Sequence, residues 1–323
     1  MKQTLDAVTI LMVMLWTGSA LQPALAQSRV ARVGLLTVDE STQVLEPFYR
    51  VLREHGWVEG KNVVVELRHG GGDPRRLDEP AAELVRSKVD VLVPIGPPPV
   101  RAAFAATRTI PIVAHDLETD PVVAGYVQSY SRPGGNVTGL FLDSPDLAGK
   151  WLELLKTIVP SLSRAVVLWD STSGPIPLNA VRTVAPSFGV KLQVLEIRTP
   201  EEIDRASGAF RGNPQALIVL PSPMMYFQSA RLARLAEKQR LPATSMFIPF
   251  AKAGGMLAYG PDLPATFERC GELVAKILAG AKPGDLPIER PTKFDFVLNL
   301  KTARALRLTM PDTVLLRADE VIQ

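Results

Sequence analysis

Cysteine, histidine and aromatic residues are scarce in this chain of 323 residues. The single cysteine, Cys270, excludes an internal disulfide and a cysteine-based zinc site, and we expect it to be buried in a helix. The three histidines show no paired metal-binding spacing, so we expect no metal and no other cofactor. Aromatic residues make up 6% of the chain and no basic stripe occurs, so no nucleic-acid partner is expected.

Long apolar runs are also lacking, because no stretch beyond the N-terminus reaches the roughly 18 uncharged apolar residues of a membrane span. Residues 1–26 combine Lys2, an apolar run from Ala7 to Trp16 and the sequence Ala24-Leu25-Ala26. This pattern predicts a signal peptide cleaved before Gln27 and a periplasmic location. An amphipathic terminal helix of a cytosolic protein is the alternative.

The rest of the chain alternates apolar, β-branched runs with amphipathic stretches. Strands are predicted at Val30–Leu36, Val63–Leu67, Val89–Ile95, Ile110–Ala114, Val137–Leu142, Ala165–Trp169, Lys191–Ile197, Ala216–Leu220, Ala243–Phe247, Gly254–Tyr259 and Phe294–Leu298. Helices are predicted at Thr42–His55, Arg75–Lys88, Val100–Arg108, Asp146–Ile158, 176–187, 200–211, 224–240 and Asp262–Leu278. The order predicts an α/β fold of two Rossmann-like lobes with parallel sheets, joined by a hinge that the chain crosses several times.

Catalytic signatures are mostly missing. No G-x-G-x-x-G follows a strand and no G-x-S-x-G occurs, so neither a dinucleotide site nor a nucleophile elbow is indicated. His115 and Asp116 follow a strand directly and could form a proton relay, but no serine or cysteine is placed beside them. Three roles stay open for His115 and Asp116: contact with a ligand, an ordinary loop position, and catalysis.

Polar and aromatic residues at strand ends are the best candidates for ligand contacts. They are Thr37, Asp39, Asp116, Asp143, Asp170, Ser171, Ser222, Phe247 and Tyr259. In facing sheets these ends converge on one cleft, where carboxylates bind ammonium groups and Phe141, Trp169, Phe247 and Tyr259 would wall the pocket. The same residue types are also ordinary caps and turns, and that interpretation stays open for each of them.

Several linked motifs resemble those of the ABC-importer substrate-binding protein family. They are the stretch Arg132-Pro133-Gly134-Gly135-Asn136-Val137-Thr138-Gly139, Asp120-Pro121-Val122, Tyr259-Gly260-Pro261, Pro291-Thr292-Lys293-Phe294 and the ending Arg317-Ala318-Asp319-Glu320-Val321-Ile322. The likeness runs from about Arg29 to Gln323.

The resemblance implies a type I periplasmic-binding fold with three crossings between lobes. Residues 29–140 and 251–292 would form one lobe, and 141–250 and 293–323 the other. Such a protein closes on a small-molecule solute and presents it to an ABC permease in the inner membrane, and we expect a monomer. Some relatives are similar to tryptophan or tyrosine receptors. The turn at 132–136 and the ending at 317–322 would be structural signatures.

One loop departs from the family pattern. The residues after the third strand are Gly96-Pro97-Pro98-Pro99, where the family commonly has small residues, and three prolines remove three amide donors. Gly96 and Pro97 would then form part of a stiff apolar wall. This puts a typical amino-acid ligand in doubt and favours a less polar organic acid or an aromatic compound.

A solute receptor of an ABC importer is therefore the main hypothesis. A periplasmic α/β enzyme using His115 and Asp116, and a sensor-type receptor that signals to a partner, are the alternatives. A cytosolic regulator of the same fold is disfavoured by the predicted signal peptide and by the absence of a preceding DNA-binding helix pair.

Overall fold

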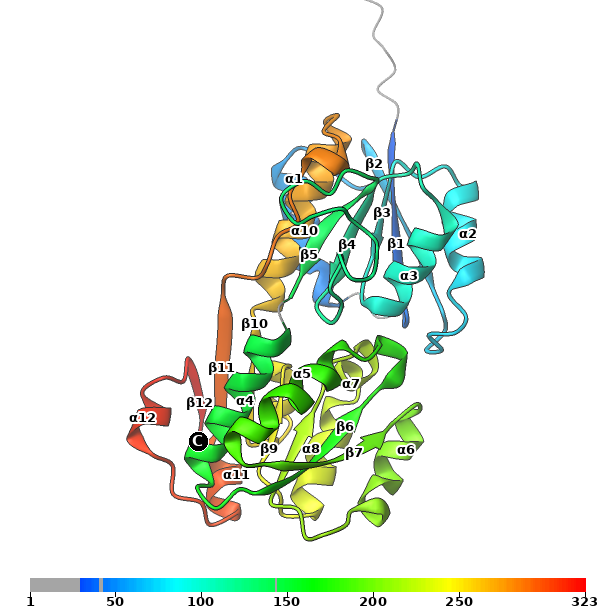
Figure 1. Cartoon of the computed structure of the whole chain (residues 1–323). Coiled ribbons are helices and arrows are strands. Elements are labelled where there is room, and N and C mark those ends of the chain that lie inside the picture. Colours follow the sequence, from blue (N-terminus) through cyan, green and yellow to red (C-terminus); the bar gives the residue numbers. More distant parts are fainter. Residues whose placement is uncertain (1–29, 41–42, 143) are drawn as a thin grey trace, which may run out of the picture.

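Two α/β lobes, each built on its own sheet, make up the protein in a computed structural model (Figure 1). The structure describes residues 30–40, 43–142 and 144–323, so the predicted signal peptide and Asp143 lie outside the described residues. Within those ranges, no helix has the length and apolar character needed to cross a membrane. The predicted fold class is confirmed.

The first lobe contains a five-stranded sheet in the order β2-β1-β3-β4-β5, and all its pairs are parallel. Its strands are β1 (Ala31–Thr37), β2 (Val63–His69), β3 (Val91–Pro94), β4 (Ile112–Asp116) and β5 (Val137–Phe141). Central strands such as β3 are buried along their whole length, which explains why their sequences are continuously apolar.

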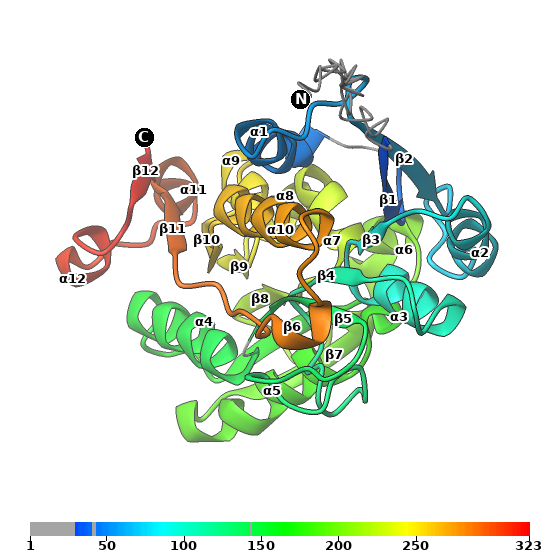
Figure 2. The ribbon, with the colours of Figure 1, turned by 90° about the horizontal axis from the view of Figure 1, so that it is seen from above.

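Helices cover both faces of this sheet. They are α1 (Glu46–Glu54), α2 (Asp78–Arg86), α3 (Pro97–Ala106) and α10 (Leu263–Leu278). Because side chains alternate along a strand, Val33 and Leu35 pack with α1 and α10, whereas Leu36 packs with α2 and α3. Helices α1 and α10 lie side by side although they are far apart in sequence (Figure 2). Cys270 is buried in α10, as predicted.

The second lobe contains a seven-stranded sheet in the order β12-β11-β10-β9-β8-β6-β7, which is parallel except for the pair β10–β11. Its strands are β6 (Arg164–Trp169), β7 (Lys191–Glu196), β8 (Ala216–Val219), β9 (Ala243–Ser245), β10 (Leu257–Pro261), β11 (Phe294–Asn299) and β12 (Glu320–Ile322). Its helices are α4 (Ser144–Ile158), α5 (Ile176–Val184), α6 (Pro200–Arg205), α7 (Pro223–Phe227), α8 (Ser229–Lys238), α9 (Ile248–Lys252), α11 (Leu300–Ala305) and α12 (Asp312–Leu315).

The chain passes between the sheets after β5, between β10 and α10, and before β11 (Figure 1). The prediction that all of 251–292 belongs to the first lobe is wrong for its first part. Strand β10 pairs with β9 and β11, so residues 257–261 belong to the second sheet and the return crossing falls at Asp262. Glu289 is still held to the first lobe, because its N–H donates to the Gly139 carbonyl at 2.9 Å.

The two motifs expected to be structural lie in fold-forming contacts. The Asn136 side chain donates to the Ile110 carbonyl at 2.8 Å, which ties the turn before β5 to the turn before β4. At the C-terminus, the Asp319 carboxylate accepts from the Phe296 N–H at 2.8 Å and Glu320 begins β12 beside β11. The predicted helix at 224–240 is two helices that are separated at Gln228.

Candidate functional site

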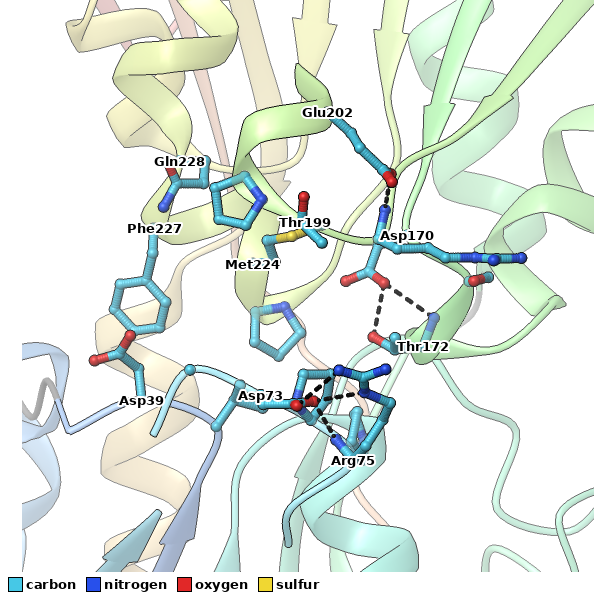
Figure 3. A pocket seen from close by; sticks show the side chains of 18 residues that line it. Asp39, Asp73, Arg75, Asp170, Thr172, Thr199, Glu202, Met224, Phe227 and Gln228 are labelled. Atoms are coloured by element: carbon cyan, nitrogen blue, oxygen red, sulfur yellow. Dashed lines mark hydrogen bonds and ion pairs between the residues drawn. The ribbon is translucent and has the colours of Figure 1, made fainter. Parts of the chain in front are cut away.

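The carboxyl ends of the two sheets face each other across a cleft with two adjacent chambers. The outer chamber has a volume of about 770 Å³ and is lined from both lobes (Figure 3). Loops after β1, β2, β6 and β7 contribute, together with the first turns of α3 and α7. Its lining is Val38, Asp39, Gly72, Asp73, Pro74, Arg75, Pro98, Asp170, Ser171, Thr172, Arg198, Thr199, Pro200, Glu202, Pro223, Met224, Phe227 and Gln228.

The two arginines of the outer chamber are already paired with carboxylates. The Arg75 guanidinium donates to both Asp73 carboxylate oxygens at 2.9 Å, and these hydrogen bonds lower the pKa of Asp73 to about 2. The Arg198 side chain donates to Glu196 at 2.8 Å. An anionic solute in the outer chamber would therefore compete with resident carboxylates for both guanidinium groups.

The inner chamber is smaller and mostly apolar, with a volume of about 80 Å³. Pro223 and Phe227 line both chambers, so the two lie side by side. Its lining is Val44, Ile95, Gly96, His115, Leu117, Glu118, Pro223, Tyr226, Phe227, Phe247, Leu263 and Phe267. Residues of both lobes meet here, with α10 on the side of the first lobe and α7 on the side of the second, so relative movement of the lobes would change the shape of the chamber.

Aromatic rings form much of the inner wall. Tyr226 lies edge-on to Phe227 and Phe247, with ring centroids 5.3 and 5.1 Å apart. Across the chamber, the imidazole of His115 stacks on Phe267 at 4.4 Å between centroids. Such walls favour an apolar or aromatic solute body, and their ring faces attract cations.

His115 is held as a neutral structural side chain. Its Nε2 lies 2.9 Å from the Thr266 hydroxyl, which itself donates to the Leu263 carbonyl at 2.7 Å. Because the hydroxyl has only one proton, Nε2–H of His115 is the donor. Burial lowers the pKa of His115 to about 4. Asp116 points to the opposite face of β4, so the two side chains do not form the relay that the enzyme hypothesis needs.

Three buried carboxyl groups surround the inner end of the cleft: Asp116, Glu118 and Asp170. Burial raises the pKa of Asp116 to about 6, and one of its oxygens has no hydrogen-bond partner. Burial and the neighbouring Asp116 carboxylate raise the pKa of Glu118 well above its usual range. Asp170 instead accepts hydrogen bonds from the N–H and hydroxyl of Thr172, at 2.9 and 2.7 Å.

The proline-rich loop forms the first turn of α3. Pro97, Pro98 and Pro99 are buried there and carry no N–H. The flanking donors are already used, because the Gly96 N–H donates to the His115 carbonyl at 2.7 Å and the Val100 N–H to the Gly96 carbonyl at 3.1 Å. The start of α3 therefore offers no backbone donor to an anion, which fits the predicted apolar wall.

Two direct contacts between the lobes lie beside the cleft. Gly96 has φ +89, and a Cβ atom added to it would lie 2.6 Å from Cγ of Pro223 in the second lobe. Nearby, the Arg101 guanidinium donates to the Thr172 carbonyl across the cleft at 2.6 Å. These contacts describe a closed arrangement of the two lobes.

The residues predicted from strand ends divide into three groups. Those that line a chamber are Asp39, Gly96, His115, Asp170, Ser171 and Phe247. Those that lie outside both linings are Thr37, Pro97, Asp116, Phe141, Ser222 and Tyr259. Asp143 falls outside the described residues.

The residues outside the linings have other packing partners. Phe141 is fully buried in the core of the first lobe, and Tyr259 stacks on Phe294, so neither walls the pocket as predicted. Trp169 donates from Nε1 to the Gly174 carbonyl and also lies outside the linings. The Ser222 hydroxyl accepts from the Met225 N–H as the cap of α7.

Sequence reasoning missed Glu118, Tyr226, Phe227 and Phe267. Glu118 follows β4 by two residues, and Tyr226 and Phe227 lie in the short helix after β8, so a wider window after each strand would have included them. Phe267 lies in α10 and reaches the chamber only because that helix packs on the first sheet. No local sequence signal indicates this contact.

Comparisons with known proteins agree with this geometry. Residues 33–322 match a family model described as ABC transporter substrate binding protein. A tyrosine-binding protein of Clostridioides difficile (strain R20291) is 26% identical over 282 residues, which cover 84% of this chain and 80% of that protein.

Two solved structures are similar over nearly their whole length. A conserved domain protein from Vibrio cholerae is 26% identical, with a TM-score of 0.84 and coverage of 91% of this chain and 100% of that one. An ABC domain in complex with L-Trp from Streptococcus pneumonia is 22% identical, with a TM-score of 0.81 and coverage of 90% and 99%.

Proposed function

Because the chain belongs to the family of ABC transporter substrate-binding proteins, we propose that its lobes close on a small amino-acid-like or aromatic solute in the cleft, with the apolar part of the solute in the inner chamber. Members of this family bind small solutes and deliver them to a membrane permease. The observation that carries the proposal is the aromatic inner chamber, whose lining comes from both lobes and from α10. Solute contacts to both lobes stabilise the closed arrangement, which a permease can recognise.

The proposal includes the place of action. The protein would be exported by the segment 1–26, cleaved before Gln27, and would act as a monomer in the periplasm beside an inner-membrane permease. The solute is released unchanged. The names of two relatives, a tyrosine-binding protein and a domain in complex with L-Trp, support an aromatic solute.

A thermal-shift screen of residues 27–323 against amino acids, aromatic acids and amines tests the proposal. A solute at about 100 times its dissociation constant adds roughly 2.7 kcal/mol to the free energy of unfolding and raises the melting temperature. Mass spectrometry of the recovered solute must show it unchanged. Consumption of the solute would instead support the enzyme hypothesis.

A pair of variants locates the binding. Tyr226→Ala removes a half-buried ring from the inner wall. It should weaken solute affinity at least tenfold and so reduce the rise in melting temperature. Tyr49→Ala removes a similarly half-buried ring on α1, away from both chambers, and should leave affinity unchanged. Equal effects of the two variants would contradict binding in the inner chamber. Solute uptake by a strain that carries the intact permease then separates transport from sensing.

A further inference from the structure

We infer that the inner chamber selects a solute in which a cationic nitrogen adjoins an apolar body and no carboxylate is present, with Glu118 as the counter-ion. The inference rests on the proposed function and specifies its solute class. Three observations carry it: an acidic side chain in the chamber wall, the lack of cationic side chains in the described lining, and the aromatic character of the remaining wall.

Glu118 is the acidic residue in the lining of the inner chamber, and it is 4% exposed. Among the described residues, no cation forms an ion pair with it. The groups that act on its carboxyl are the Leu117 backbone N–H and the carboxylates of Asp116 and Asp170. A buried carboxylate without a cation is unfavourable, and a cationic solute group would supply the missing partner.

Cationic side chains are missing from the same space, because the described lining of the inner chamber contains no lysine or arginine and its histidine is held neutral. The nearby start of α3 offers no backbone donor either, because it consists of three prolines and the Gly96 and Val100 N–H groups are already bonded. The Arg101 guanidinium on α3 is engaged with the Thr172 carbonyl. The Nε2–H of His115 is directed at Thr266, so the neutral Tyr226 hydroxyl is a remaining side-chain donor in the lining, and the first residue of α10, Leu263, also lies there.

A solute carboxylate would therefore find no cationic side chain in the lining of the inner chamber. It would also have to be desolvated beside Glu118, whose carboxyl group burial already holds protonated. An ammonium group meets the opposite situation, because Glu118 attracts it directly and the faces of Tyr226, Phe227 and Phe247 add cation–π attraction. Ion pairing with Glu118 and cation–π attraction therefore both favour an ammonium group over a carboxylate.

Calorimetric titration of residues 27–323 with three compounds that share one aromatic skeleton but differ in their charged groups tests this inference. The probes are tyramine, which has the amine only, tyrosine, which has both groups, and 4-hydroxyphenylacetate, which has the acid only. A second series uses an aliphatic body: isoamylamine, leucine and 4-methylpentanoate. We expect an amine to bind at least tenfold more tightly than its zwitterion, and the acids to bind most weakly.

Two outcomes separate the inference from the proposed function. Tighter binding of a zwitterion or an acid than of its amine would overturn the inference and leave the proposed function intact. No binding by any member of either series would contradict both.

Variants assign the effect to named groups. Glu118→Gln should weaken amine binding at least tenfold and leave acid binding unchanged or stronger, and its melting temperature shows whether it is folded. Glu66→Gln removes a largely buried carboxylate of β2 that lies in the lining of neither chamber, and it is the control. Equal loss of amine affinity in Glu118→Gln and Glu66→Gln would overturn the inference.

Discussion

The contact between Gly96 and Pro223 makes lobe closure testable with a single methyl group. The distance of 2.6 Å from an added Cβ atom to the Pro223 ring is about 1 Å shorter than an ordinary carbon–carbon contact. The loop at Gly96 begins a buried helix turn of three prolines and cannot yield easily. In Gly96→Ala the lobes must therefore stay farther apart.

Gly174 supplies a matched control. Its backbone angles, φ 92 and ψ 177, nearly equal those of Gly96, φ 89 and ψ 164, but an added Cβ atom would meet nothing within 4 Å. Both positions lie in a region that is essentially restricted to glycine, so alanine should cost about 1–3 kcal/mol of folding stability at either one. The difference between the variants isolates the contact between lobes.

The magnitude follows from short-range dispersion. A gap of about 0.5–1 Å forfeits a quarter to a half of each contact energy across the closed interface. We expect Gly96→Ala to lose at least tenfold in solute affinity, which corresponds to about 1.4 kcal/mol. Gly174→Ala should bind like the unmodified protein. Calorimetric titration with the most strongly stabilising solute measures both, and equal affinities of the two variants would refute the role of closure.

Three further predictions concern other buried groups. Burial raises the pKa of Asp116 to about 6 from 3.8 and also raises that of the neighbouring Glu118, so the folded state holds these protons longer and the free energy of unfolding falls as pH rises from about 4 to 6. Asp116→Asn should flatten that fall in urea titrations, and an unchanged slope would contradict the assignment. Arg101→Ala removes the hydrogen bond to the Thr172 carbonyl and should weaken solute binding by about 1 kcal/mol in calorimetry. An unaltered affinity would show that this hydrogen bond does not stabilise the closed arrangement. Cys270 is buried and its thiol pKa is raised, so a thiol reagent should modify it in urea but not in the native protein, and rapid native labelling would contradict its placement.

The order of strands and helices could be predicted because apolar periodicity reports burial directly. The lobe to which β10 belongs could not be predicted, since the sequence of Leu257–Pro261 indicates a strand but not the strands with which it pairs. The antiparallel pairing with β11, a strand far along the chain, draws it into the second sheet. Chain topology rather than local sequence decided that boundary.

The candidate site was predictable in location but not in detail. Strand ends indicated the cleft, and the prolines after Gly96 indicated a wall without donors. Phe141 and Tyr259 were misassigned because a side chain at a strand end can point into the core as easily as into the cleft. Glu118 and Phe267 were missed because a loop turn and a helix from a later crossing bring them to the chamber.

The measurement that tests the central claim most directly is the distance between spin labels on the two lobes with and without solute. Labels at Arg86→Cys on α2 and Arg205→Cys on α6 replace exposed side chains, while the native Cys270 is buried. Closure on a solute predicts that double electron–electron resonance gives a shorter and narrower distance distribution when solute is added. An unchanged distribution in the presence of a bound solute would contradict the account.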